Sequence, residues 1–192
     1  GDMEETSAAA SELKLGINGF GRIGKLTVWH HVGRKYFSEL VVNIGRRAGT
    51  SLADMAHYIE RDSTYGRLGA YLHGCQAGPV ISDLDEKTGS MRVDGVRIRF
   101  LQAARNPAHI AWKDIGVKLV VDTTGKFLDP TADAETPKGS LRGHLESGAE
   151  KVVVSAPFKT KGPEMDMPPD AVTTVMGIND NEYDPRRHRL IS

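Results

Sequence analysis

The sequence predicts an α/β fold with a doubly wound, mostly parallel sheet and a β-hairpin insertion. Three observations lead to this prediction. Continuous apolar runs such as Leu40–Ile44 and Val152–Val154 are typical of strands that are covered on both faces. A segment with helical spacing, residues 22–36, lies between the first two strands. Asp94-Gly95 separates two alternating strands, which predicts a two-residue hairpin turn.

The composition is that of an ordinary globular protein with balanced charge. The 192 residues include 25 Lys and Arg against 25 Asp and Glu, and 39% are hydrophobic. No apolar stretch approaches the roughly 20 residues that span a bilayer, and the charge balance argues against a dedicated nucleic-acid binder. The single cysteine, Cys75, excludes an internal disulfide and favours a reducing compartment. We therefore expect a cytoplasmic protein that binds neither membranes nor nucleic acid.

Residues 1–12 are acidic and rich in small side chains. They have neither the basic region nor the apolar region of a signal peptide. We expect a disordered N-terminal extension or a tag-removal scar here, followed by one folded domain over residues 13–192.

Helices and strands alternate along this domain, beginning with a βαβ unit whose crossover should be right-handed. Helices are expected over residues 22–36, 51–59, 106–112 and 141–148. Strands are expected over residues 13–17, 40–44, 80–81, 91–93, 96–100, 117–122, 152–154, 172–176 and 188–191. Ser51 has the side chain of a helix N-cap, and Asn106-Pro107 is typical of a cap followed by a first turn.

A glycine-rich turn joins the first strand to the first helix. Gly19, Gly21 and Gly24 form the pattern G-x-G-x-x-G, with a strand before it, a helix after it and a second strand within about thirty residues. Gly19 permits a tight turn, Gly21 lets backbone amides approach a pyrophosphate, and Gly24 lets the helix pack close to the strand. The positive end of the helix dipole favours the anion. The pattern therefore predicts a Rossmann-type dinucleotide site rather than a plain βα turn.

The end of the second strand bears on which dinucleotide is bound. In NAD binders, an acidic residue about 20 positions past the motif bonds the ribose 2′-hydroxyl. Here that position is Gly45, and Arg46 and Arg47 follow it. A guanidinium binds a 2′-phosphate that a carboxylate would repel. We expect NADP to be accepted with NAD still tolerated, and the alternative is a pair of solvated loop arginines.

Several segments make the chain similar to one known family. Asn18–Gly24 resembles the opening of phosphorylating glyceraldehyde-3-phosphate dehydrogenases. The similarity continues in the family's order through Asp62–Gly66, Asp122–Gly125, Val154–Pro157 and Met176–Asn179, and it covers residues 13–192. Erythrose-4-phosphate dehydrogenases share most of these segments. They stay an alternative, as does a dinucleotide-binding module without chemistry of its own.

The resemblance implies a role for each matching residue. Arg22 and Ile23 would offer backbone amides to the pyrophosphate, and Arg105 would lie near the adenine. Thr124 and Gly125 would line the crevice, while Ser155 and Ala156 would lie toward the nicotinamide. The expected cofactor-binding residues are Asn18, Gly19, Phe20, Gly21, Arg22, Ile23, Gly45, Arg46, Arg47, Arg105, Thr124, Gly125, Ser155 and Ala156. The loops at 132–141 and 159–170 look longer than the family norm, and no function follows for them.

The resemblance also implies an activity for a longer parent enzyme. The family is homotetrameric and oxidises glyceraldehyde 3-phosphate with phosphate and NAD(P) to 1,3-bisphosphoglycerate, through a cysteine thiolate. In the family, Ile191-Ser192 leads into the segment that carries this cysteine, and the present sequence ends at Ser192. We therefore expect a fragment with no catalytic residue and no metal site, inactive alone and prone to dimerise through exposed apolar surface. Cys75 is expected to be structural or incidental.

Overall fold

The computed structural model describes residues 13–45, 50–102, 104–160, 167–174 and 182–192. The strands are β1 (Lys14–Asn18), β2 (Glu39–Asn43), β3 (Arg61–Asp62), β4 (Gly66–Arg67), β5 (Ile81–Asp85), β6 (Ser90–Val93), β7 (Val96–Leu101), β8 (Leu119–Asp122), β9 (Lys151–Val154), β10 (Ala171–Val172) and β11 (Leu190–Ile191). The helices are α2 (Arg22–Arg34), α3 (Leu52–Glu60), α4 (Leu68–His73), α5 (Trp112–Ile115) and α6 (Leu141–Glu146), with a 3₁₀ turn η1 (Pro107–His109).

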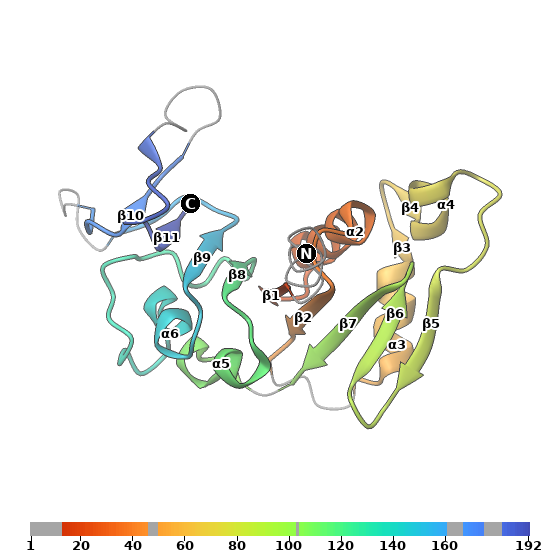
Figure 1. Ribbon diagram of the computed structural model, residues 1–192, viewed down its shortest axis with the longest axis horizontal. Coiled ribbons are helices and arrows are strands. Elements are labelled where there is room, and N and C mark those ends of the chain that lie inside the picture. Colours follow the sequence, from red (N-terminus) through yellow and green to blue (C-terminus); the bar gives the residue numbers. More distant parts are fainter. Residues whose placement is uncertain (1–12, 46–49, 103, 161–166, 175–181) are drawn as a thin grey trace, which may run out of the picture.

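The main sheet is parallel over most of its width and reverses its strand order at β1. Its order is β10-β11-β9-β8-β1-β2-β7-β6-β5 within the described residues. β1 pairs in parallel with β2 on one side and with β8 on the other, and the antiparallel pairings are those of β6 with β7 and with β5 at one edge (Figure 1). This is a doubly wound sheet with a hairpin insertion, which confirms the predicted fold class. Ligands of such folds bind where the strand order reverses, beyond the carboxyl ends of the strands.

Each face of the sheet carries its own hydrophobic core. Val42 belongs to a cluster with Trp29 of α2 and Met55 of α3. Its neighbour Val41 belongs to a cluster on the opposite face, with Trp112 of α5 and Leu141 of α6. Successive strand residues point to opposite faces, so β2 is buried on both sides, as the continuous apolar run predicts.

Two local signals in the sequence form as expected. Ser51 caps α3: its hydroxyl accepts from the Asp54 amide at 3.2 Å, and the Asp54 carboxylate accepts from the Ser51 amide at 3.4 Å. This reciprocal pair is a capping box. Asp94 and Gly95 join β6 to β7 with φ values of 49° and 83°. Positive φ at both positions is typical of the primed turns that match strand twist.

The segment 106–112 is not the single helix that the sequence suggests. Asn106 does cap it, because its Oδ1 accepts from the Ala108 amide at 3.0 Å. The turn nevertheless ends at His109, and Trp112 begins the separate helix α5. Ile110 and Trp112 are both almost fully buried, at 1% and 0% exposure. Residues two positions apart lie on different sides of a helix, so an extended break is needed to bury both.

Other elements also differ from the expectation, for example β5, which was expected over residues 80–81 and spans Ile81–Asp85. The short helix α4 and the two-residue pair β3–β4 were not predicted, because neither has a sustained period. The strand expected over 172–176 is β10, Ala171–Val172, and part of that segment lies outside the described residues.

In the described part of the chain, no helix is long and apolar enough to cross a bilayer.

Candidate functional site

A cleft of about 880 Å³ opens at the carboxyl ends of β1, β2 and β8. Segments far apart in the sequence meet there: the glycine turn, the end of β2, the segment before η1, the segment after β8 and part of the loop before α6. Its lining residues are Asn18, Gly19, Phe20, Gly21, Asn43, Ile44, Gly45, Ala104, Arg105, Asn106, Thr123, Thr124, Lys126, Phe127, Pro137, Lys138 and Gly139. The cleft therefore lies at the switch point of the sheet, where doubly wound folds bind ligands.

The three glycines of the turn have different surroundings. A Cβ on Gly24 would lie 2.3 Å from the Gly19 carbonyl oxygen, so no larger residue fits where α2 crosses the turn. Gly19 has a φ of +107°, and a Cβ there would lie 2.7 Å from Thr123 Oγ1. A Cβ on Gly21, in contrast, would meet nothing within 4 Å. The turn is thus closely packed at Gly19 and Gly24 and open at Gly21. A phosphate group requires such an open approach to the backbone.

The first turn of α2 supplies hydrogen-bond donors to this space. No side chain caps the helix at Gly21. The backbone amides of Arg22 and Ile23 have no hydrogen-bond partner within the described residues. Unsatisfied amides and the helix dipole together favour an anion at this end of a helix. The residues present thus fit a pyrophosphate.

Asp62 binds the Arg22 side chain at the start of α2. The guanidinium donates from Nε to Asp62 Oδ1 at 3.2 Å and from Nη2 to Thr64 Oγ1 at 3.1 Å. Asp62 Oδ2 also accepts from the amides of Thr64 and Tyr65 at 2.9 and 3.0 Å. The hydrogen bond from Arg22 lowers the pKa of Asp62 to about 2, against the opposing effect of burial. The segment 62–66 is therefore fastened to the first turn of α2.

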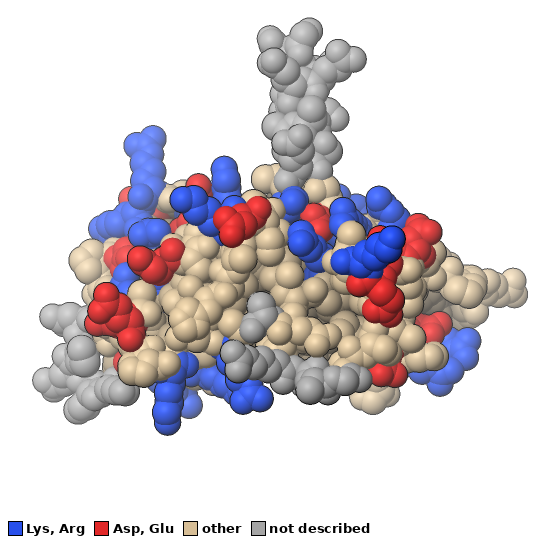
Figure 2. Space-filling model, turned by 90° about the horizontal axis from the view of Figure 1, so that it is seen from below, with Lys and Arg blue, Asp and Glu red and all other residues tan. Residues whose placement is uncertain are grey.

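Among the residues that the structure describes, the cleft lining carries three cations, Arg105, Lys126 and Lys138, and no Asp or Glu. Their side chains form no hydrogen bond or ion pair with any residue that the structure describes. Over the face of the molecule in Figure 2, by contrast, basic and acidic side chains are interspersed. The cleft is thus a local concentration of positive charge on a protein that is neutral overall.

Gly45 and Arg105 lie together at the end of β2. Gly45 has a φ of +69°, and a Cβ on it would lie 3.5 Å from Arg105 Cγ. The stem of an arginine therefore packs where dinucleotide-binding domains that prefer NAD carry a carboxylate. Arg46 and Arg47 lie outside the described residues, so their predicted contact with a 2′-phosphate stays a prediction.

The structure gathers some of the predicted site residues and leaves others apart. Those that line the cleft are Asn18, Gly19, Phe20, Gly21, Gly45, Arg105 and Thr124. Those that do not line it are Arg22, Ile23, Gly125, Ser155 and Ala156. Ser155 follows β9, and its hydroxyl donates to the Asp122 carbonyl at 3.3 Å.

Comparison with known proteins identifies the family. The family described as glyceraldehyde 3-phosphate dehydrogenase, NAD binding domain, matches residues 13–130. The chain belongs to this family. The glyceraldehyde-3-phosphate dehydrogenase of Geobacillus stearothermophilus is 34% identical over 180 residues, that of Heyndrickxia coagulans 36% over 181, and the glycosomal enzyme of Crithidia fasciculata 33% over 181. In each case the match covers 94% of this chain and 44% of the relative, so the chain spans less than half of the relatives' length.

Ten lining residues of this NAD-binding domain's cleft were not predicted from the sequence, among them Asn43, Lys126 and Lys138. Lys126 and Lys138 come from loops whose position depends on the fold. Asn43 ends an apolar run, and the same is true of Asn18 and Asp122, which end β1 and β8. A polar residue at the last position of each of three buried strands is a signal that could have identified the edge of the sheet where the cleft lies.

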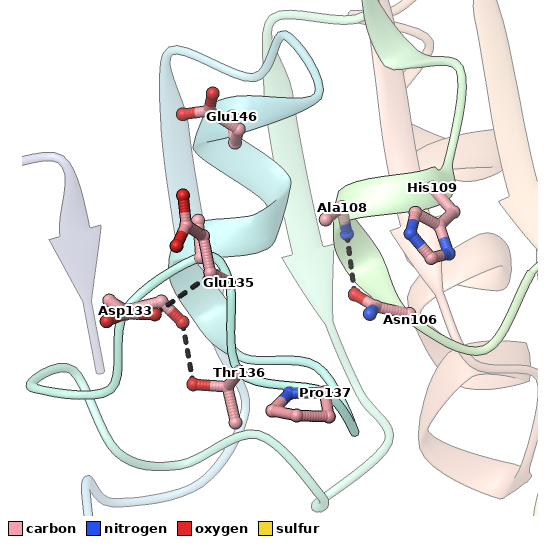
Figure 3. A pocket seen from close by; sticks show the side chains of 9 residues that line it. Asn106, Ala108, His109, Asp133, Glu135, Thr136, Pro137 and Glu146 are labelled. Atoms are coloured by element: carbon pink, nitrogen blue, oxygen red, sulfur yellow. Dashed lines mark hydrogen bonds between the residues drawn. The ribbon is translucent and has the colours of Figure 1, made fainter.

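A second hollow of about 730 Å³ adjoins the cleft of the NAD-binding domain. Figure 3 shows Asp133 and Glu135 from the loop before α6 on one wall, and Asn106 and His109 on the other. The Glu135 amide donates to Asp133 Oδ1 at 2.9 Å, so this carboxylate is used within the loop.

The described residues hold no group of three or more His, Cys, Asp or Glu side chains placed for a metal ion. Cys75 is exposed and lines neither hollow.

Proposed function

We propose that this domain binds NAD or NADP in the cleft between β1, β2 and β8. One observation carries the proposal: among the described residues, the open glycine turn and the unpartnered amides of α2 adjoin a cleft lined by three cations without an ion pair and by no carboxylate. The amides of Arg22 and Ile23 would hold the pyrophosphate, and Arg105 would lie toward the adenosine. Thr124 would line the crevice between them. When bound, the nicotinamide ring accepts or donates a hydride.

We further propose that NADP is accepted. The reason is the sign of the charge near the ribose. Gly45 cannot repel a 2′-phosphate, and the Arg105 stem packs beside it. A guanidinium forms charge-assisted hydrogen bonds with phosphate oxygens. Arg46 and Arg47, which follow in the sequence, would add to this attraction.

For the whole protein we propose phosphorylating oxidation of glyceraldehyde 3-phosphate, in line with the family and the names of the relatives. That reaction requires a thiolate at the substrate aldehyde. The sequence has one cysteine, Cys75, which is exposed and outside the cleft. Residues 1–192 alone are therefore predicted to bind a dinucleotide without turning over the aldehyde. Their oligomeric state stays a prediction, which light scattering would measure.

The test is titration of the chain with NADPH and with NADH, followed by fluorescence of the reduced nicotinamide. We expect both to bind, with NADPH at least as tight as NADH at low salt, and with the difference shrinking as salt rises. The variant Arg105→Ala and the double variant Arg46→Ala/Arg47→Ala should lose NADPH affinity more than NADH affinity. Arg186→Ala is the matched control, because Arg186 is exposed and does not line the cleft.

The outcomes separate the two parts of the proposal. If neither nucleotide binds, the domain does not have the function proposed. If NADH binds more tightly and the arginine variants change nothing, NADP acceptance is wrong and NAD binding stands. Aldehyde-dependent formation of NADPH by residues 1–192 would contradict the predicted lack of turnover.

A further inference from the structure

The last residues of three adjacent strands form one buried hydrogen-bonded ladder. Asn43 of β2 pairs in register with Asn18 of β1, which pairs in register with Asp122 of β8. Asn43 Nδ2 donates to Asn18 Oδ1, and Asn18 Nδ2 donates to Asp122 Oδ2, each at 3.0 Å. All three residues are at most 3% exposed. Buried polar side chains linked in this way fix one arrangement of the strand ends.

The ladder continues away from the cleft into helix α6. His144 Nε2 lies 2.8 Å from Asp122 Oδ2, and Trp112 Nε1 donates to His144 Nδ1 at 3.0 Å. An indole nitrogen can only donate, so His144 Nδ1 accepts and the ring carries its proton on Nε2. His144 therefore donates to Asp122. Its side chain is fully buried and does not line the cleft.

Each strand end in the ladder runs directly into a wall of the cleft. Gly19 follows Asn18, Ile44 follows Asn43, and Thr123 follows Asp122. Asn43 Nδ2 also donates to the Ala104 carbonyl at 2.8 Å, which ties in the segment that carries Arg105. The ladder thus connects four of the five chain segments that form the walls of the cleft.

Asp122 is the centre of the ladder because its two oxygens accept four hydrogen bonds. Besides Asn18 and His144 at Oδ2, Oδ1 accepts from the Thr124 amide at 3.0 Å and from its hydroxyl at 2.7 Å. Burial raises the pKa of Asp122, but the bonds from His144, Asn18 and Thr124 outweigh it and hold the pKa below its ordinary value. The carboxylate stays ionised, as four donors require.

Helix α6, which carries His144, packs closely against its neighbours. A Cβ on Gly143 would lie 2.7 Å from the Ala108 amide, and one on Gly148 would lie 2.6 Å from Lys113. Gly143 lets α6 pack closely on η1, and Gly148, two residues after α6, lets the chain pack closely on α5, so the His144 ring between them has little freedom to shift.

We propose that His144 is a positioning residue for the dinucleotide site. It acts through Asp122 on the glycine turn and on Thr124, and it touches no part of the cleft. The inference rests on the proposed function, since it concerns how the same cleft is held in shape. If His144 is merely structural, its substitution lowers stability and leaves the dinucleotide affinity of the folded molecules unchanged. If His144 is a positioning residue, its substitution also lowers that affinity.

The experiment compares His144→Gln, which keeps an N–H donor toward Asp122, with His144→Phe, which has none. Leu190→Ala is the matched control, because Leu190 is fully buried in the core on the same face of the sheet and does not line the cleft. NADPH dissociation constants are measured well below the lowest melting temperature of the set. We expect His144→Phe to weaken binding by about 10-fold, as other residues that orient a binding group do, and His144→Gln to stay within about 3-fold of the parent. The control should lose stability without losing affinity.

A second readout does not depend on nucleotide. Amide NMR shifts of Gly19, Gly21 and Thr124 should move in His144→Phe and not in Leu190→Ala. If His144→Phe does not fold, His144→Asn serves in its place, because its shorter side chain does not bring a donor to Asp122. Unchanged affinity and unchanged glycine shifts in a folded variant would overturn the inference. If the parent chain binds neither nucleotide, the proposed function fails, and the NMR comparison still decides whether His144 positions the turn.

Discussion

The Arg22 guanidinium lies against the Asp62 carboxylate, with Nε 3.2 Å from Oδ1. This pair determines what the glycine turn presents to a ligand. Asp62 binds Arg22 and also lies 3.8 Å from Lys25 Nζ, so both cationic side chains of the first turn of α2 are paired and the donors at the open turn are backbone amides. Backbone donors do not change rotamer, so the proposed phosphate site is formed before a ligand arrives.

Removing the Asp62 charge is expected to make the domain less stable in a pH-dependent way. The pKa of Asp62 is lowered from 3.8 to about 2 in the fold. A lowered pKa means that the carboxylate stabilises the fold above about pH 4, and that this contribution is lost as pH falls toward about 2. Thermal melts of the parent and of Asp62→Asn should therefore differ at neutral pH and converge in acid. Asp83→Asn, at an exposed residue of β5, should follow the parent throughout.

His31 is expected to contribute a second pH dependence at higher pH. Burial, together with the nearby His30 and Arg34, lowers the pKa of His31 from 6.5 to about 4. The folded state thus favours the neutral ring, so stability is full above about pH 6.5 and falls as pH drops toward about 4. Because the ring stays partly in water, we expect the loss to be about 1 to 2 kcal/mol. Unfolding free energies from urea titrations between these pH values should depend less steeply on pH in His31→Gln than in the parent. An equal dependence on pH would contradict the prediction.

Two alanine substitutions in the glycine turn are expected to affect different properties, one stability and the other NADPH affinity. In Gly24→Ala the new Cβ would lie 2.3 Å from a backbone oxygen that cannot move freely. Overpacking of this kind costs about 3 kcal/mol, so the melting temperature should fall sharply. Gly21→Ala meets nothing within 4 Å and keeps an extended φ of −76°. Its stability should change by less than about 1 kcal/mol, while NADPH affinity drops because the methyl group occupies the open space. Equal melting temperatures for the two variants would show that the turn packs differently.

Lys138 is expected to attract the dinucleotide from the loop before α6. It is exposed, lines the cleft and has no ion pair with the described residues. Lys138→Ala should weaken NADPH binding by about 3-fold at low salt, corresponding to a surface charge interaction of under about 1 kcal/mol. The effect should vanish at high salt. Lys87→Ala, on the hairpin turn between β5 and β6, is the control and should bind as the parent does.

Features with a local physical cause could be predicted from the sequence. The capping box at Ser51 needs only residues three positions apart, and the hairpin turn at Asp94 needs only two residues that tolerate positive φ. The glycine turn is similar in part, because Gly19 requires a positive φ and Gly24 lies against the backbone of Gly19, five positions earlier. The break between η1 and α5 could not be predicted in this way, since the burial of both Ile110 and Trp112 depends on what packs around them.

The fold class, the glycine-rich turn and the membership of a dinucleotide-binding family follow from the order of amino acids alone. Short-range spacing and hydrophobic period contain that information. The meeting of Arg105 with Gly45, the cationic lining that includes Lys138, and the ladder from Asn43 to His144 belong to the folded chain. Asn18 and Asp122 are 104 positions apart, and parallel pairing through β1 is what places them 3.0 Å from each other. Contacts of this kind arise from strand register and crossover packing, which no local stretch of sequence specifies.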